Sequence, residues 1–446
     1  MIKTKNIENE KVKQKKKELQ IIGQGGYGCV FRPEIQCNTL RPGSRKYVSK
    51  VQLSTTVSDS ESKIGSIIQT IPHYSSYFAP VLENCPLSIK TIETYKINES
   101  CKDIKEEFKY PSKNTSFISS KIQYVGETDL GDYINHLLLK CTKKSNKICS
   151  ASFNWHSYIK KHIYSHLYLL RSTQKLSEKG IVHMDIKSNN IIYDNKNNHF
   201  VAIDFGISVL FSDIETSTYE MNAKKPFGIS ASHYIPWCID IMILSYIARQ
   251  IKLDNPNPNS TYVDSKKFNA KPTSTSIEEM KAICLKYATS LNIFIDSQEK
   301  EVLIDQLHKW VQDFSSKTYK DIWTLLIANY KTWDNYSICA MYLYEWVVIG
   351  IYQDLIHIEN KNIINIYLSK LKSVLLSLPN KRDDSSKTYD FIVKLFSKIK
   401  KSQYNIMVEQ FSQIISSPEK IQKIKEAHQQ RKINDLQIEH DFYHQK

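Results

Sequence analysis

Two short apolar runs separated by a polar turn constrain this chain more than any other feature. The runs are Ile191–Tyr193 and Phe200–Ile203, and the turn between them is rich in Asn and Lys. This pattern predicts a β-hairpin. Asp185, Asn190 and Asp204 lie at the margins of the hairpin, and a tight pair of strands would bring these three polar groups to one place.

Such a group of side chains suits phosphoryl transfer. The reaction needs one carboxylate to orient the attacking hydroxyl or accept its proton, and a second carboxylate with an amide oxygen to hold Mg²⁺ against the phosphates. Residues 183–190 read H-M-D-I-K-S-N-N, and residues 204–206 read D-F-G. These two segments resemble the catalytic loop and the metal-binding loop of protein kinases. A hairpin with polar ends by chance is disfavoured, because two motifs coincide at the expected spacing.

The resemblance assigns a role to each polar residue. It implies that Asp185 is the catalytic base and that Lys187 contacts the transferred phosphate. It also implies that Asn190 and Asp204 bind Mg²⁺. Lys187, two positions after the base, favours serine or threonine over tyrosine as the acceptor.

A glycine-rich turn near the start of the chain supports the same family. Residues 19–31 read as strand, turn and strand, and the motif fits G-x-G-x-[FY]-G-x-V of the kinase loop that closes over ATP phosphates. A dinucleotide-binding fold uses a similar motif, but there a helix follows the turn. The resemblance implies that the residues contacting the nucleotide here are Gly23, Gln24, Gly25, Gly26, Tyr27, Gly28 and Val30.

Further nucleotide contacts are expected along the chain. Lys50 ends a short strand at the place of the kinase lysine that binds the α- and β-phosphates. Glu61, on a predicted helix with Ile64, Ile67 and Ile68 on one face, is its expected partner. Asp59 competes for that role with a shorter side chain.

Residues 122–130 resemble the hinge between kinase lobes. There the backbone of Gln123 and Val125 would bind adenine, and Asp129 would bind the ribose hydroxyls.

Two aspartates compete for the place that braces the catalytic loop. Asp334, followed by Tyr336 and Ser337, fits the family pattern better than Asp240. We therefore expect Asp334 to reach the backbone near residues 183 and 184. Asp240 would then stand in the place of the glutamate of the kinase A-P-E motif, and the resemblance implies that it pairs with Arg382, so that neither buried charge is left alone.

Composition limits the remaining possibilities. The net charge of +15 permits acidic partners, but it fits a solvated surface in a Lys- and Asn-rich chain, and nucleic acid is not an expected partner. No run of about 18 apolar residues exists, so no membrane span is expected. Nine scattered cysteines without a C-x-x-C pair indicate a reducing, intracellular compartment. A bridge between Cys141 and Cys149 is disfavoured.

The resemblance as a whole is to eukaryotic-type serine/threonine protein kinases, in particular those of large cytoplasmic DNA viruses. It implies an ATP- and Mg²⁺-dependent enzyme acting on protein substrates in the host cytoplasm, with packaging into the virus particle left open. The implied fold is α+β and bilobal, with ATP between a small β-rich lobe and a large helical lobe. A small-molecule phosphotransferase and a weakly active pseudokinase scaffold are the alternatives. The expected segments are a basic arm (1–18), the small lobe (19–121) with an insertion (85–120), the hinge (122–130), the large lobe (131–416) with an insertion (about 250–330), and a polar tail (417–446).

Overall fold

The computed structural model gives the chain a mixed α+β structure. It describes residues 19–25, 28–36, 43–109, 115–139, 155–215, 227, 234–251, 263–348 and 363–400, with the single residues 402, 405, 426 and 430. The chain divides into two compact units. The first unit holds the residues up to Ser54 and Glu83–Tyr124, and the second holds Thr55–Leu82 and the residues from Val125 onward. The expected basic arm and most of the expected polar tail lie outside the described residues.

The first unit is built on a five-stranded antiparallel sheet in the order β1-β2-β3-β5-β4. The strands are β1 (Gln20–Gly25), β2 (Gly28–Arg32), β3 (Tyr47–Leu53), β4 (Val81–Leu87) and β5 (Phe117–Gln123). In the register of the sheet, Lys50 of β3 lies opposite Val30 on one side and Ser120 on the other. The strand–turn–strand that the glycine motif predicts is therefore present as β1 and β2.

Three short helices fill the connection between β4 and β5, where the sequence predicts an insertion. They are α2 (Ile89–Thr94), α3 (Ile97–Ser100) and α4 (Lys102–Lys109). Their apolar side chains form one buried cluster with side chains of β2, β3 and β5. A disulfide joins Cys29 of β2 to Cys101 between α3 and α4. Cys85 is also disulfide-bonded.

The Cys29–Cys101 bridge is a pairing that the sequence analysis did not predict, because no sequence motif links these two residues, which are 72 positions apart. Cys238, Cys284 and Cys339 of the second unit are free and buried. Cys141 and Cys149 lie outside the described residues.

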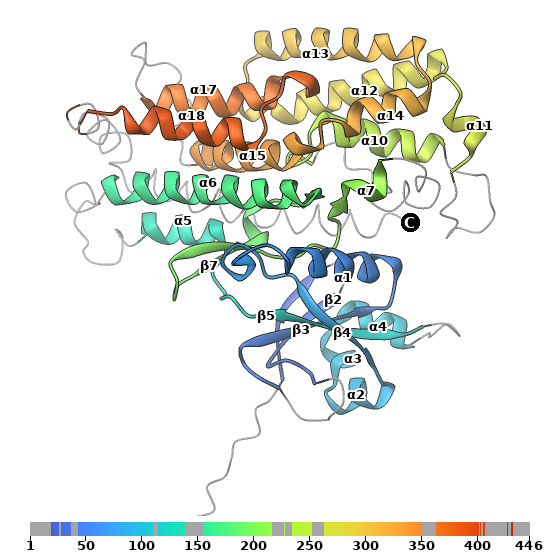
Figure 1. Ribbon diagram of the computed structural model, residues 1–446, viewed down its shortest axis with the longest axis vertical. Helices are drawn as coiled ribbons and strands as arrows, with labels where there is room; N and C mark the ends of the chain where they lie inside the picture. The colour runs from blue at the N-terminus through green and yellow to red at the C-terminus, as the bar shows by residue number, and fades with distance from the viewer. Residues whose placement is uncertain are drawn as a thin grey trace, which may run out of the picture. The chain divides into compact units, whose positions relative to one another are not determined.

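The second unit is mostly helical. Its helices are α1 (Thr56–Ile68), α5 (Leu130–Leu139), α6 (Trp155–Glu178), α7 (Phe211–Ile214), α10 (Ile239–Gln250), α11 (Ser265–Phe268), α12 (Ser274–Ser290), α13 (Ser297–Gln312), α14 (Tyr319–Ile327), α15 (Trp333–Val348), α17 (Ile363–Leu376) and α18 (Ser385–Ser397). Short strands β6 (Ile181–Val182) and β9 (Val209–Leu210) pair with each other, as do β7 (Ile191–Asp194) and β8 (His199–Ala202). Within this unit α6, α15, α17 and α18 pack side by side (Figure 1).

The predicted insertion in the helical part of the chain consists of α11 to α14. Polar residues set where these helices begin: Thr273 caps α12, and capping boxes of Asp296 with Glu299 and of Thr318 with Asp321 open α13 and α14. The helices bury their apolar faces against one another and against α10. They are therefore part of the packed unit and not a loop excursion.

Residues 55–82 pack with the second unit, although the sequence analysis placed them in the small lobe. The Ala79 N–H donates to the Ala202 carbonyl (3.0 Å), and the Ala202 N–H donates to the Tyr77 carbonyl (2.9 Å). Phe78 meets the ring of Phe205 edge-on at 6.2 Å. These contacts tie the segment after α1 directly to strand β8 and the residues that follow it.

Among the described residues, none of the helices combines the length and apolar character that a bilayer crossing demands.

Candidate active site

The predicted hairpin is confirmed, and it sets the positions of the polar residues at its margins. Strands β7 and β8 pair antiparallel with Ile191 opposite Ala202. The pairing continues one step further, because the Ile203 N–H donates to the Asn190 carbonyl at 2.9 Å. Asn190 therefore lies beside the residue that immediately precedes Asp204.

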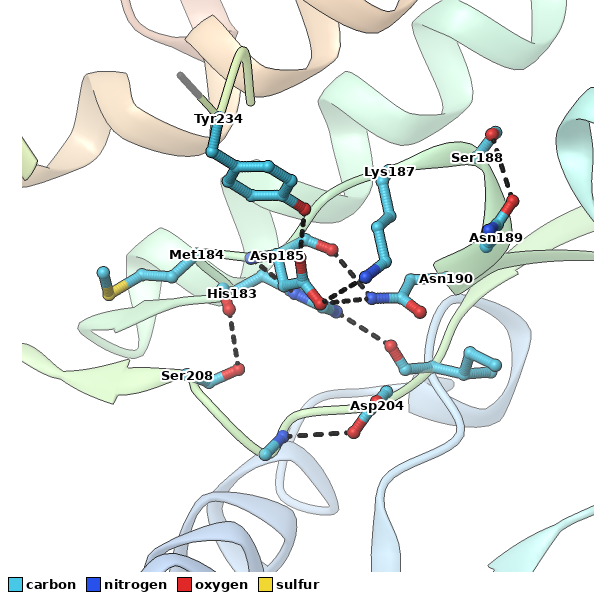
Figure 2. Close-up of polar contacts among 12 residues, drawn as sticks. His183, Met184, Asp185, Lys187, Ser188, Asn189, Asn190, Asp204, Ser208 and Tyr234 are labelled. Carbon is cyan, nitrogen blue, oxygen red and sulfur yellow. Dashed lines mark hydrogen bonds and ion pairs between the residues drawn. The ribbon is translucent and has the colours of Figure 1, made fainter. Parts of the chain in front are cut away.

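Asp185, Lys187 and Asn190 form one buried polar cluster (Figure 2). The Asn190 side-chain amide donates to the Asp185 Oδ2 atom (2.8 Å) and to the Asp185 carbonyl (2.9 Å). The Lys187 Nζ atom lies 3.2 Å from the same Oδ2 atom. Because the Asn190 Nδ2 donates to Asp185, its Oδ1 atom remains the acceptor end of the amide. The cluster thus presents a fixed carboxylate, an ammonium and an amide oxygen together.

Asp204 adopts a left-handed backbone conformation with φ of 60°. Residues other than glycine rarely adopt this conformation, and where they do, the surrounding structure imposes it. Here the Gly206 N–H donates to the Asp204 Oδ1 atom (3.4 Å), and the preceding Ile203 carbonyl lies 3.0 Å from the His183 Nε2 atom. His183 therefore links the catalytic-loop motif to the residue next to Asp204 (Figure 2).

Asp334, at the start of α15, braces the backbone ahead of Asp185. Its two carboxylate oxygens accept hydrogen bonds from the N–H groups of His183 (2.8 Å) and Met184 (3.0 Å). Burial raises the pKa of the Asp334 carboxyl, against the opposing electrostatic effect of nearby His183 and of these two backbone donors. The contact predicted for Asp334 is confirmed.

Asp240 and Arg382 form the second predicted pair, and it is confirmed as well. The Arg382 Nη2 atom lies 2.9 Å from Asp240 Oδ1, and Nη1 lies 3.3 Å from Oδ2. Both side chains are fully buried. Trp333 also donates its indole N–H to Asp240 Oδ2 at 3.0 Å. Since Trp333 directly precedes Asp334, this ion pair supports the helix end that braces the loop.

The first unit carries the predicted nucleotide-binding residues of β1 to β3 and the end of β5. Lys50 is buried within β3, and Gln123 ends β5. Gly28 opens β2 with φ of 139°, and a Cβ atom there would lie 2.2 Å from the Val51 carbonyl oxygen. Only glycine fits that position. Four other predicted nucleotide contacts of this unit lie in β1 and β2, namely Gly23, Gln24, Gly25 and Val30. The remaining two, Gly26 and Tyr27, lie outside the described residues.

The second unit carries Glu61, Val125 and Asp129. Glu61 is buried on α1. The Asp129 Oδ1 atom accepts a hydrogen bond from the Asp132 N–H (2.7 Å) at the start of α5, so this carboxylate has a structural contact. Glu61 and Lys50 belong to different units, each described by itself, and their pairing stays a prediction. The nucleotide contacts of Gln123, Val125 and Asp129 stay predictions too.

Tyr234 and Trp237 are site residues that the sequence analysis did not single out. The Tyr234 hydroxyl donates to Asp185 Oδ1 at 2.6 Å (Figure 2). The Trp237 indole N–H donates to the Met184 carbonyl at 2.8 Å. The signal for these two residues in the sequence is a pair of aromatic residues around Pro236, between a polar stretch and an apolar helix. Both residues are buried in the structure.

The donor set around the hairpin suits a hard divalent cation. Mg²⁺ prefers oxygen ligands and is commonly held by one or two carboxylates together with substrate phosphates. The Asp204 carboxylate and the Asn190 amide oxygen match that chemistry. Within the described ranges no three His, Cys, Asp or Glu side chains gather in a way that could hold a metal ion on their own. A Mg²⁺ ion held by Asn190 and Asp204 would complete its coordination with water or substrate oxygens.

Comparison of the chain with protein-family models and with curated proteins finds no match. The argument for function therefore depends on the residues and their geometry.

Proposed function

We propose that this chain is a serine/threonine protein kinase that transfers the γ-phosphoryl group of ATP to hydroxyl groups of protein substrates. The observation that carries the proposal is the fixed Asp185 carboxylate, with Lys187 and Asn190 bonded to one of its oxygens. The kinase-like bilobal architecture belongs to the same proposal. The mixed α+β fold and the five-stranded antiparallel sheet are compatible with it.

Asp185 would orient the acceptor hydroxyl and accept its proton. A group in this role must keep one geometry while the acceptor arrives, and positioning contributes much of the catalysis in phosphoryl transfer. The neighbouring Lys187 ammonium would stabilise negative charge on the transferred phosphate oxygens. Because Asp334 fixes the two N–H groups that precede Asp185, the carboxylate is also held through its backbone.

Asn190 and Asp204 would hold Mg²⁺, which when bound neutralises charge on the phosphates. Lys50 would bind phosphate oxygens, and Glu61 would orient Lys50. The glycine-rich motif of β1 and β2 would cover the phosphates, as in the kinase loop that it resembles.

A phosphotransfer assay with labelled ATP and a mixture of Ser- and Thr-containing peptides tests the proposal. We expect transfer by the wild-type chain in the presence of Mg²⁺, and a loss of at least about a thousandfold in Asp185→Asn, since the amide cannot accept the proton. Asp305→Asn is the matched control, because Asp305 is exposed on α13, outside the cluster. Wild-type rates in Asp185→Asn, or transfer to small-molecule acceptors alone, would contradict the proposal.

A further inference from the structure

The turn Tyr234–Trp237 contacts the loop that carries Asp185. The Trp237 N–H donates to the Tyr234 carbonyl at 2.9 Å, which closes the turn. The Pro236 carbonyl accepts a hydrogen bond from the Ser337 hydroxyl of α15 at 2.6 Å. The turn is therefore attached to the same helix that supplies Asp334.

Both aromatic side chains of this turn donate to consecutive residues of the loop. Tyr234 bonds to the Asp185 side chain and Trp237 to the Met184 carbonyl. Their rings meet edge-on with centroids 5.8 Å apart, and Trp237 is fully buried. The two hydrogen bonds are thus made by side chains that packing holds in place.

The two carboxylate oxygens of Asp185 have different hydrogen-bond partners. Oδ2 faces Asn190 and Lys187, while Oδ1 accepts the hydroxyl of Tyr234. A hydrogen bond from a donor to an ionised carboxylate is short and strong. The hydrogen bond from Tyr234 therefore fixes the rotation of the Asp185 carboxylate about its Cβ–Cγ bond. The contacts to Oδ2 alone would restrict this rotation less.

We propose that Tyr234 and Trp237 form an aromatic clamp that positions Asp185, and that this clamp holds the loop without a phosphate. The inference rests on the proposed kinase function. Met184 is apolar and buried, so it offers no charge to a phosphorylated segment. Its carbonyl is held by Trp237, and its N–H by Asp334. The contacts that hold the loop in position therefore come from within the chain.

The way in which Tyr234 is anchored indicates that it positions Asp185 and does not block the acceptor hydroxyl. A side chain that only blocked the acceptor would have to leave during each reaction. Tyr234 belongs to a turn that is bonded to α15 and packed on a buried tryptophan. Each carboxylate oxygen can accept two hydrogen bonds, so the acceptor hydroxyl can reach Oδ1 while Tyr234 stays.

Phenylalanine substitutions test the clamp, because they remove each donor and keep the ring. In Tyr234→Phe and Trp237→Phe we expect kcat for peptide phosphorylation to fall roughly tenfold to a hundredfold, as expected for a lost hydrogen bond to a charged or fixed group. KM for ATP should stay within about twofold, because Asp185 acts on the acceptor. Tyr246→Phe is the matched control: Tyr246 of α10 is buried, and its hydroxyl donates to the Glu279 Oε2 atom of α12 (2.7 Å), outside the site.

Hydrogen–deuterium exchange of the full chain without nucleotide gives a second readout that needs no activity. Peptides spanning residues 183–187 should exchange roughly tenfold faster in Trp237→Phe than in the wild type or in Tyr246→Phe, because the loop loses an anchor. Unchanged exchange together with unchanged kcat overturns the clamp, and so does a higher kcat in Tyr234→Phe, which would mean occlusion. If the wild type transfers no phosphate, the proposed function fails, and the exchange comparison still decides whether the turn holds the loop.

Discussion

Around β2 and the inserted helices, the first unit buries an apolar cluster that a disulfide crosses, whereas the second unit buries charged and histidine side chains between its helices. Cys29 and Cys101 join a strand to a helical insertion. In contrast, Asp240, Arg382 and Asp334 are buried at the ends of helices of the second unit, near the Asp185 loop. The disulfide restricts the conformations that the unfolded chain can adopt. The buried charged side chains instead fix the orientation of the backbone groups that bond to them.

This difference indicates what each device contributes. A disulfide acts largely on the conformational freedom of the unfolded chain and specifies little about a side chain's direction. A buried carboxylate is costly without partners, so it is stable only where its donors are in place. Buried charge in the second unit is therefore tied to the geometry of the candidate site.

The largest effect should follow from breaking the Asp240–Arg382 pair. Arg382→Ala leaves a buried carboxylate with the Trp333 donor, and should lower the free energy of unfolding by about 3–5 kcal/mol. Denaturant unfolding followed by tryptophan fluorescence measures this, because every tryptophan lies in the second unit. Lys63→Ala, which breaks the exposed pair with Asp213, is the control and should cost about 1 kcal/mol at most. If both variants lost the same free energy of unfolding, the buried pair would contribute no more to stability than an exposed pair.

A smaller effect, confined to the first unit, should follow from removing the disulfide. Cys29→Ala combined with Cys101→Ala should lower the stability of this unit by about 2–4 kcal/mol. Exchange of β2 and β3 amides should become faster, while the fluorescence transition of the second unit stays unchanged. The double variant is preferred to a reductant, since Cys85 is also disulfide-bonded. A shift of the fluorescence transition would show that the effect of the disulfide is not confined to the first unit, and would contradict the difference between the units.

The buried histidines of α6 give the second unit a pH dependence. Burial lowers the pKa of His162 to about 3 and lowers that of His166 well below its usual value. Aromatic rings surround both histidines: Tyr158, Tyr342 and Trp346 lie against His162, and Tyr342 and Tyr367 lie against His166.

The sign of the effect follows from where the protons bind. The unfolded chain takes up a proton on His162 below pH about 6.5, while the folded chain keeps this ring neutral until about pH 3. Stability is therefore full above pH 6.5 and falls by about 1.4 kcal/mol per pH unit for each such histidine as the pH decreases. Unfolding of His162→Phe between pH 7.5 and 4.5 should show a slope smaller by that amount. Identical slopes for variant and wild type would contradict this assignment.

Local motifs made much of the second unit predictable. The hairpin, the helix that carries Glu61 and the positions of Asp334 and Asp240 follow from short patterns whose residues act on near neighbours or on one expected partner. The partners of these two aspartates were inferred from the resemblance to the kinase pattern, and the cost of a lone buried carboxylate explains why each of them has partners.

Contacts between distant segments were not predictable in the same way. Nothing local in the sequence indicates that Cys29 meets Cys101, or that Tyr234 reaches Asp185 across 49 positions. Residues 55–82 are tied to the helical unit by backbone hydrogen bonds of Ala202 with Tyr77 and Ala79, and backbone bonds of this kind can form whatever the side chains are. Such pairings are decided by tertiary packing.

The measurement that tests the central claim most directly is phosphoryl transfer by Asp204→Ala. Asp204 is partly exposed, so Asp204→Ala should stay folded, at a cost of about 1–2 kcal/mol because alanine tolerates the left-handed backbone less well than aspartate. Transfer of labelled phosphate to Ser/Thr peptides should be lost at every Mg²⁺ concentration, because the carboxylate that would bind the cation is gone. Normal turnover by a folded Asp204→Ala protein would contradict the account of this site.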